Sequence, residues 1–439
     1  MDRTREIAYD PAIGTLQVGC KVEKIKVAQE EKNLQSVMAN RAVVTRTAGL
    51  ALVRVDRGLT IDEVVSAGPA AGSRAMDTRT AILRWASLAI LLLAGCRTRQ
   101  RSEVPSPSIP SARTQRVLAS DPRFVYEGRF DHSDPNAPVV IWQASRVRLD
   151  FEGDAIDLLF DKPKGQCFFN AQVDGSTKIV EVREGSPPLG STISGLGPGR
   201  HHLVLFKRSE ADAGTARFRG ASLPPGAQAW RPAPIPYRLR MEFIGDSITA
   251  GACNEDGQED QWEDRRTHNA ALSYAALTAA AFNADHRNIA VSGMGISTGW
   301  VEKKAGQVWD RLYPDASSPR ADLQAWTPDI VFVNLGENDD SFPKAHGQPF
   351  PAGYTDGYIA LVQAVRTAYP RARIVLLRGG MSGGSQSGPL RHAWEAAVAR
   401  LEATDQAVSH FVFTHWSTNH PRVLDHHALT AELTGRVRP

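Results

Sequence analysis

The chain has few of the features that mark a metalloprotein or a nucleic-acid-binding protein. Its cysteines are Cys20, Cys96, Cys167 and Cys253, and they lack the paired spacing of metal ligands. Its 12 histidines form no zinc pattern either. The formal net charge is only +3 and the basic residues are scattered, so the composition points away from a polyanionic partner. We therefore expect no metal site and no nucleic-acid partner.

Long hydrophobic runs are also scarce, and the run from Ala81 to Ala94 is too short to cross a bilayer easily. Arginines lie at its start, and it ends in Leu93-Ala94-Gly95-Cys96. A charged start, a short apolar core and a small-residue exit indicate a secretion signal. The last four residues resemble a bacterial lipobox, in which the cysteine becomes the lipidated first residue of the mature protein. The alternative interpretation is a short buried helix.

We therefore predict a lipoprotein signal peptide over residues 76–96, lipidation at Cys96, and attachment to the membrane through that lipid. The protein would be an exported lipoprotein of the bacterial cell envelope, facing the outer membrane or the periplasm. Residues 97–120 read as a polar tether rich in proline and serine. Residues 1–75 are an uncertain extension, either mis-assigned upstream sequence or an unusual leader, with segments compatible with short helices.

Residues 121–231 show the pattern of many short strands. Polar and apolar residues alternate over Arg146–Phe151, as in a strand with one buried face. Turn signals such as Asp174-Gly175 recur between such segments, which favours a β-sandwich. A proline-rich stretch makes residues 232–239 the natural linker.

Residues 240–439 change to an alternation of apolar strands with helices. Ala271–Phe282 and Tyr358–Tyr369 read as helices, and Ile330–Leu335 and Ile374–Leu377 read as buried strands. Strands that alternate with helices indicate a parallel sheet covered on both faces. The predicted fold is thus multidomain, a β-sandwich followed by a three-layer α/β domain.

The most informative stretch is Met241–Gly251, where an apolar strand runs into Gly245-Asp246-Ser247 and a small-residue turn. A serine at that turn sits where a strand ends and a helix begins, next to unpaired backbone N–H groups. This setting suits a nucleophile whose attack creates an oxyanion. The competing interpretation is an ordinary strand-exit turn capped by Asp246.

Three further blocks follow in order. Ser292-Gly293-Met294-Gly295 and Gly336-Glu337-Asn338-Asp339 each follow an apolar strand, and His420 lies in the last loop. In an open α/β sheet the residues beyond the carboxyl ends of the strands converge at one rim. Ser247, a glycine N–H, the Asn338 amide and His420 supply a nucleophile, oxyanion donors and a base, which acyl transfer needs.

This order of blocks resembles the SGNH (GDSL) hydrolase superfamily from about Arg240 to the C-terminus. The resemblance implies that Ser247 is the nucleophile and His420 the general base. It also implies an oxyanion hole formed by the N–H groups of Ser247 and Gly295 and by the Asn338 amide. Gly293 is the second candidate for the glycine. No cofactor is needed for this chemistry.

One residue departs from the superfamily pattern, which usually has an aspartate three residues before the histidine. Ser417 stands there. A carboxylate would fix the tautomer of His420 and stabilise its charged form. We therefore expect a Ser–His dyad in which a backbone carbonyl orients His420, with Asp425 as the alternative partner.

Fragments before Arg240 carry a second resemblance. They are Tyr126-Glu127-Gly128-Arg129, Ile141-Trp142-Gln143-Ala144-Ser145, Phe151-Glu152-Gly153, Val173-Asp174-Gly175, Gly199-Arg200-His201-His202, Lys207-Arg208-Ser209-Glu210 and Phe218-Arg219-Gly220. Together they resemble the N-terminal jelly roll of carbohydrate esterase family 2. In that family a jelly roll precedes an SGNH domain that removes acetyl groups from plant polysaccharides.

Several acidic and cysteine residues lie near these motifs, and we expect them to support the fold rather than to take part in catalysis. Glu337, Asp339 and Asp340 read as turn structure rather than metal ligands, and Cys253 has no base placed for it. Cys167 and Cys253 fall in different domains and are expected to be unpaired. Trp300, Trp309, Trp326 and Trp416 could line a sugar-binding cleft or belong to the core, and Trp416 is the best candidate to contact a sugar ring.

The resemblance implies a serine esterase that removes O-acetyl groups from a polysaccharide of the xylan or glucomannan type. One rival is an esterase acting on a lipid, on peptidoglycan or on a thioester. The other is a non-catalytic, glycan-binding surface lipoprotein. The presence of Ser247, Asn338 and His420 favours the enzyme over the binding protein.

Overall fold

The computed structural model describes residues 6–10, 15–19, 43–47, 50–54 and 114–437. The predicted signal peptide, Cys96 and most of the predicted tether lie outside the described residues. Within the described part of the chain, no helix is both long enough and apolar enough to cross a membrane.

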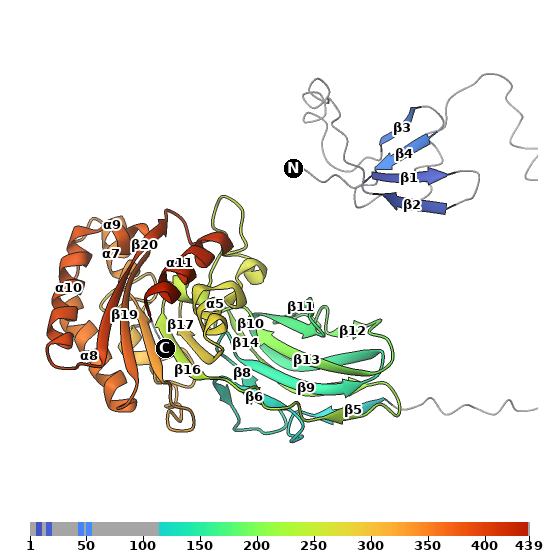
Figure 1. Cartoon of the computed structure of the whole chain (residues 1–439), viewed down its shortest axis with the longest axis horizontal. Coiled ribbons are helices and arrows are strands. Elements are labelled where there is room, and N and C mark those ends of the chain that lie inside the picture. The colour runs from blue at the N-terminus through green and yellow to red at the C-terminus, as the bar shows by residue number, and fades with distance from the viewer. Residues whose placement is uncertain (1–5, 11–14, 20–42, 48–49, 55–113, 438–439) are drawn as a thin grey trace, which may run out of the picture. The chain divides into compact units, whose positions relative to one another are not determined.

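The described N-terminal segments are strands, so the short helices considered for residues 1–75 are wrong for these segments. They are β1 (Glu6–Asp10), β2 (Thr15–Gly19), β3 (Val43–Thr47) and β4 (Leu50–Arg54). The strands form an antiparallel sheet in the order β2-β1-β4-β3 (Figure 1). Residues with a branched β-carbon, such as Val43, Val44 and Thr45, favour strand over helix.

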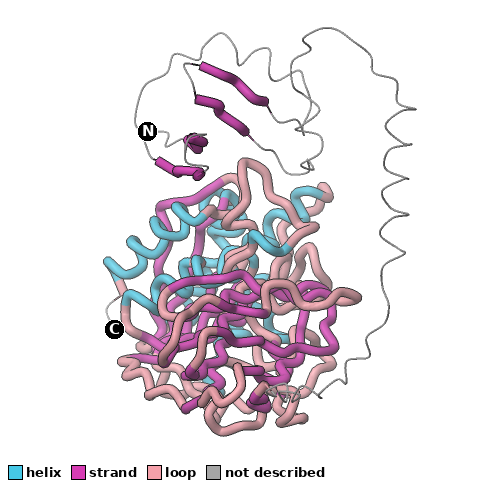
Figure 2. Tube along the Cα trace, turned by 90° about the vertical axis from the view of Figure 1, so that its right-hand side faces the viewer, coloured by secondary structure: helices cyan, strands magenta, loops and turns pink. Residues whose placement is uncertain are grey.

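The first part of the remaining chain, residues 114–238, is built from strands and loops, which Figure 2 distinguishes from the helices by colour. Its strands are β5 (Gln115–Leu118), β6 (Val125–Glu127), β7 (Phe130–Asp131), β8 (Val139–Val140), β9 (Arg146–Glu152), β10 (Ala155–Val173), β11 (Ser176–Arg183), β12 (Thr192–Ser194), β13 (Arg200–Lys207), β14 (Gly214–Leu223) and β15 (Ala229–Trp230).

The long strand β10 joins two antiparallel sheets around one apolar core. Its first half pairs with β12 and β14, and its second half pairs with β11 and β13. The register shifts between Asp161 and Lys164, and Lys162 has a positive φ of 42°. Such a bulge bends a strand and lets it pass from one sheet to the other. The predicted β-sandwich is confirmed.

The second domain contains five parallel strands in the order β17-β16-β18-β19-β20. They are β16 (Leu239–Gly245), β17 (Ala284–Ala290), β18 (Ile330–Asn334), β19 (Arg373–Met381) and β20 (Val408–Ser417). Every residue of β18 is buried, as expected for a central strand covered on both faces. The predicted parallel sheet is confirmed.

Helices cover both faces of this sheet (Figure 1). One face packs against α8 (Tyr354–Ala368) and α10 (Gly388–Glu402), and the other packs against α5 (Tyr274–Ala281) and α11 (Val423–Arg436). The shorter helices are α4 (Ser247–Ala250), α6 (Ala305–Val308), α7 (Glu337–Ala345), α9 (Ser382–Gln386), η1 (Arg265–Thr267) and η2 (Ala270–Leu272). The three layers predicted from the sequence are therefore present.

The two domains are joined by buried polar contacts. The Arg129 guanidinium, only 4% exposed, donates from Nη1 to the carbonyls of Trp309 (2.7 Å) and Arg311 (2.8 Å). Its Nη2 lies 3.6 Å from a carboxylate oxygen of Glu242, which is fully buried in β16. Burial raises the pKa of Glu242, and the positive charge of Arg129 opposes that rise. The sandwich thus supplies a counter-charge to the core of the α/β domain.

We predict that Arg129→Ala destabilises the protein by about 3–5 kcal/mol, because it leaves Glu242 buried without this partner. Arg123→Ala is the matched control, since Arg123 pairs with Asp121 at a partly exposed site and such pairs contribute about 0–1 kcal/mol. Urea unfolding followed by tryptophan fluorescence measures both changes. Equal unfolding midpoints for the two variants would show that the Arg129 contact is unimportant.

Candidate active site

Ser247 lies at the tight turn between β16 and α4, as its sequence context predicts. Gly245 is required there, because an added Cβ would lie 2.1 Å from the Thr249 hydroxyl. Asp246 caps the single-turn helix, and its carboxylate accepts the Ile248 N–H at 3.1 Å. Ser247 is only 3% exposed, so little of its surface meets solvent.

His420 reaches Ser247 from the loop between β20 and α11. Its Nε2 lies 2.8 Å from Ser247 Oγ, although the two residues are 173 positions apart in the chain. The Trp262 ring packs edge-on against the imidazole, with the ring centroids 5.0 Å apart. This contact limits rotation of His420 and leaves Nε2 facing the serine.

A carboxylate orients His420, so the expectation of a backbone carbonyl is wrong. His420 Nδ1 lies 2.6 Å from Asp260 Oδ2, and the His420 N–H donates to the same oxygen at 3.2 Å. Arg422 Nη1 donates to the other oxygen, Oδ1, at 2.7 Å. Asp260 belongs to the loop after Ser247, whereas the superfamily places its acid just before the histidine.

The protonation state of Asp260 assigns the tautomer of His420. Burial alone would raise the pKa of Asp260, but hydrogen bonds from His420 and Arg422 outweigh burial and hold that pKa well below its usual value. An ionised carboxylate only accepts hydrogen bonds, so Nδ1 of His420 carries the proton. Nε2 is then the acceptor of the Ser247 O–H.

Asp425, the alternative partner named from the sequence, has other contacts, and so do Ser417 and the nearby His426. Asp425 accepts the Arg422 N–H at 2.8 Å and lies 2.8 Å from His415 Nε2, so it caps α11. Ser417 donates to the Asn419 carbonyl at 2.7 Å and shapes the loop that carries His420. His426 is buried, and its Nδ1 accepts the Tyr274 N–H. Each of these side chains therefore bonds to its local surroundings, and none of them orients His420.

Asn338 lies in the first turn of α7, next to the turn that contains Gly293. Its side-chain amide donates to the Met294 carbonyl at 3.0 Å and to Asp246 at 3.2 Å. Asp339 accepts three backbone N–H groups of the same turn at 2.7–3.0 Å, from Ile296, Ser297 and Thr298. These bonds support the structural interpretation of Asp339 and fix the turn beside Asn338.

Between the two candidate glycines, the structure favours Gly293. Gly293 lines the same cavity as Ser247, Asn338 and His420, and it has a φ of 78°. Gly295 is not among the lining residues, and an added Cβ there would lie 1.7 Å from the Thr298 carbonyl oxygen. The preference for Gly295 therefore does not agree with this geometry. Gly295 serves the fold of the turn, and Gly293 faces the cavity.

The cavity over Ser247 has a volume of about 500 Å³. Its walls combine both domains and are formed by Glu210, Asp212, Ala213, Ser247, Trp262, Arg265, Ser292, Gly293, Trp300, Val301, Glu337, Asn338, Ser341, Met381 and His420. A pocket of this size, with two aromatic rings and a few convergent polar groups, is typical of a small-ligand site.

The aromatic residues of the cavity differ from the tryptophan chosen from the sequence. Trp262 and Trp300 line it, and both have exposed surface. Trp416 is 39% exposed on β20 but is not among the lining residues. Trp262 was missed because it lies in an irregular loop whose path the residue pattern does not predict.

Two buried carboxyl groups lie near Ser247, and burial raises the pKa of each. Burial, followed by repulsion from Glu337, raises the pKa of Asp246 well above its usual value. Burial also raises the pKa of Glu337, which accepts the N–H groups of Gly383 and Gly384.

Cys253 and Cys167 are buried and unpaired, as expected. Cys253 Sγ lies 3.5 Å from His268 Nε2. Cys253 also belongs to two groups of side chains that are close enough to share a metal ion, one with Asp256 and His268 and one with Asp260 and His420. Burial, with nearby Asp260 and Asp256, raises the pKa of the Cys253 thiol, and burial raises that of Cys167 to about 11. Protonated thiols are poor nucleophiles and poor metal ligands, so we assign neither role to Cys253.

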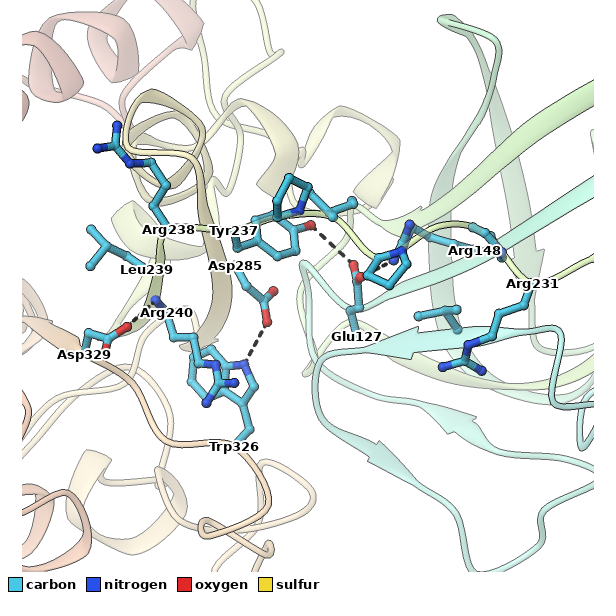
Figure 3. A pocket seen from close by; sticks show the side chains of 15 residues that line it. Glu127, Arg148, Arg231, Tyr237, Arg238, Leu239, Arg240, Asp285, Trp326 and Asp329 are labelled. Carbon is cyan, nitrogen blue, oxygen red and sulfur yellow. Dashed lines mark hydrogen bonds and ion pairs between the residues drawn. The ribbon is translucent and has the colours of Figure 1, made fainter.

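A second cavity, of about 560 Å³, lies at the junction of the two domains (Figure 3). Its carboxylates are engaged, since Glu127 pairs with Arg148 and Asp285 accepts the indole N–H of Trp326. It contains no serine, cysteine or histidine among its lining residues. The cavity over Ser247 is therefore the candidate active site.

Comparison with known proteins agrees with this geometry. Residues 126–234 match the family described as Carbohydrate esterase 2 N-terminal, and residues 243–429 match the GDSL-like Lipase/Acylhydrolase family. The chain is 32% identical over 329 residues to Cellulase/esterase CelE of Acetivibrio thermocellus, covering 72% of this chain but only 39% of that longer protein. It is 28% identical over 267 residues to an acetylxylan esterase / glucomannan deacetylase of Cellvibrio japonicus, covering 57% of this chain and 72% of that one.

The fold also matches a solved structure over both domains. The structure is a family two carbohydrate esterase from Clostridium thermocellum in complex with cellohexaose, with a TM-score of 0.64 and 32% sequence identity. The match covers 71% of this chain and 97% of that one. Because this solved relative is 32% identical and is covered over 97% of its length, and because both family regions are matched in order, the chain belongs to carbohydrate esterase family 2.

Proposed function

We propose that this protein is a serine esterase that removes O-acetyl groups from a polysaccharide of the xylan or glucomannan type. The observation that carries the proposal is the chain of hydrogen bonds from Asp260 through His420 to Ser247 at the wall of an open cavity. The catalytic unit is then a Ser–His–Asp triad rather than the dyad expected from the sequence.

In the acylation step, His420 Nε2 takes the proton of Ser247 as Oγ bonds to the acetyl carbonyl carbon. The electron pair of the carbonyl moves to its oxygen and forms an oxyanion. Asp260 stabilises the imidazolium that results, because its carboxylate already accepts the Nδ1–H. The sugar oxygen then leaves with the proton from His420.

The oxyanion is held by the N–H groups of Ser247 and Gly293 and by the Asn338 amide. This replaces Gly295 with Gly293, since Gly293 is the glycine that lines the cavity. Because both hydrogens of that amide are engaged in the free protein, Asn338 gives up its longer bond to Asp246 (3.2 Å) to donate to the oxyanion and keeps the bond to the Met294 carbonyl. Such preorganised donors typically contribute about 3–4 kcal/mol each to the transition state. In deacylation, His420 activates a water molecule, and acetate leaves from Ser247.

The proposed substrate class follows from the relatives and from the shape of the cavity. One relative is named an acetylxylan esterase / glucomannan deacetylase, and the solved family two carbohydrate esterase from Clostridium thermocellum is in complex with cellohexaose. In this chain Trp262 and Trp300 line the cavity with exposed surface. Flat rings of this kind suit the apolar faces of pyranose rings.

Release of acetate from a panel of acetylated xylan, acetylated glucomannan, a triglyceride and O-acetylated peptidoglycan tests the proposal. We expect acetate from the plant polysaccharides. Fatty acid from the triglyceride, or acetate from peptidoglycan alone, would favour the rival esterases. Tight binding of glycan without any release of acetate would favour the non-catalytic binding protein.

We predict that Ser247→Ala abolishes turnover of an aryl acetate, because it removes the nucleophile. Loss of the whole triad function typically costs on the order of 10⁶-fold in kcat. Thermal unfolding measured alongside checks that the variant is folded. Activity close to the wild type in this variant would rule out Ser247 as the nucleophile.

We predict that Asp260→Asn lowers kcat by about 10⁴-fold, because the amide no longer fixes the reactive tautomer of His420. Asp425→Asn is the matched control, since Asp425 caps α11 and contacts His415 instead. It should cost some stability and little activity. Equal losses of kcat in the two folded variants would contradict the role of Asp260.

The wild type and Asp260→Asn should differ in how their stability depends on pH. The folded pKa of Asp260 is depressed, so its carboxylate stabilises the folded state above the unfolded pKa of about 4 and loses this effect as the pH falls. The Tm difference between the wild type and Asp260→Asn should therefore shrink between pH 7 and pH 3. A constant difference over this range would argue against the ionised carboxylate.

We also propose that the protein is exported and anchored to the cell envelope through lipid on Cys96. The charged start, the apolar core and Leu93-Ala94-Gly95-Cys96 support this. We predict that the mature chain begins at Cys96 and carries several acyl chains, since one chain binds a membrane only marginally. Mass spectrometry of the native membrane fraction measures this, and an unmodified peptide spanning Cys96 would count against it.

A further inference from the structure

The β-sandwich domain contributes part of the wall of the active-site cavity. The connection between β13 and β14 carries Glu210, Asp212 and Ala213, and all three line the cavity beside Ser247. Contact between the two domains does not by itself explain why residues of the sandwich lie beside Ser247. Glu210 is the informative one, because it is a carboxylate that is only 3% exposed.

The Glu210 carboxylate binds the turn that follows β17. Its Oε2 accepts the backbone N–H of Ser292 at 2.9 Å, and its Oε1 lies 3.5 Å from Arg265 Nη1. A hydrogen bond from an N–H to a carboxylate is stronger than one to a neutral oxygen. Arg265 partly balances the negative charge that is brought close to the site.

The backbone that carries Glu210 is itself held from several directions. Lys207, fully buried, donates from Nζ to the carbonyls of Ser209 (2.8 Å) and Glu210 (2.9 Å). The Arg208 carbonyl accepts the N–H of Ala270, a residue of the α/β domain, at 2.8 Å. Ordinary surface loops lack such buried contacts, so this loop is a rigid support.

Gln143 connects this loop to the same end of the sheet. Its Oε1 accepts the Ala211 N–H at 2.9 Å, and its Nε2 donates to the carbonyl of Ala290, the last residue of β17, at 2.9 Å. The sandwich thus holds the turn that begins after β17 by hydrogen bonds at two places. Glu210 provides the contact nearer to the cavity.

We propose that Glu210 is a positioning residue that holds the Ser292–Gly293 turn so that the Gly293 N–H faces the oxyanion. Fixing the Ser292 N–H restrains the dihedral angles that orient the next peptide, whose N–H belongs to Gly293. The β-sandwich domain is then part of the catalytic apparatus. This inference rests on the proposed esterase function and on the assignment of Gly293.

A purely structural role for Glu210 makes a different prediction. If Glu210 only joined the domains, its loss would lower Tm and leave the kcat of the folded protein unchanged. If it positions the oxyanion hole, its loss lowers kcat more than it changes KM, because the oxyanion exists only in the transition state.

The test uses Glu210→Ala, Glu210→Gln and the control Glu127→Ala in the whole protein. Glu127 also lies in the sandwich near the domain junction, where it pairs with Arg148 and approaches the hydroxyl of Tyr237, but it lines the other cavity (Figure 3). We expect Glu210→Ala to lower kcat on an aryl acetate by about 100-fold. Glu210→Gln keeps an acceptor oxygen and should lose about fivefold.

Inhibition by a boronic acid, which forms a tetrahedral adduct on the serine, provides the second readout. Its affinity should fall with kcat in the Glu210 variants and stay at the wild-type value in Glu127→Ala. Wild-type kcat and boronate affinity in a folded Glu210→Ala would overturn the inference. If the alanine variant does not fold, wild-type kcat and boronate affinity in Glu210→Gln would overturn it instead. An inactive wild type would instead count against the proposed function.

Discussion

The hydrogen bond between His420 Nδ1 and Asp260 is the contact on which the site depends. It joins the loop after Ser247 to the loop after β20, and Arg422 strengthens it by binding the same carboxylate. Arg422 also donates to the carbonyls of Cys253 and Gly257, which fixes the loop that carries Asp260. Without this clamp, neither the tautomer nor the direction of His420 would be set.

The sheet supplies the remaining groups, and its geometry explains why they meet. Ser247 follows β16 and Asn338 follows β18, and these two strands are adjacent and parallel. Gly293 follows β17 on the other side of β16. Three consecutive strand ends therefore surround one point, and the sandwich adds a fourth wall through Glu210. The site is a product of both domains rather than of the α/β domain alone.

The sequence predicted the parts of this site that follow regular structure. Ser247, Asn338 and His420 were identifiable because apolar strands and small-residue turns mark their positions. Asp260 and Trp262 lie in an irregular loop where neither periodicity nor turn chemistry predicts a path, so both were missed. Arg422, two residues after His420, was the available hint that a carboxylate lay nearby. The choice between Gly293 and Gly295 needed the backbone, because both belong to one short turn.

A crystal structure of the protein treated with a phosphonate ester that mimics the tetrahedral intermediate tests the account most directly. We predict a covalent bond from phosphorus to Ser247 Oγ. We also predict a phosphonyl oxygen within hydrogen-bond distance of the N–H groups of Ser247 and Gly293 and of the Asn338 amide, with Asp260 still bound to His420. Attachment at another residue, or a phosphonyl oxygen directed away from Gly293 and Asn338, would contradict the account.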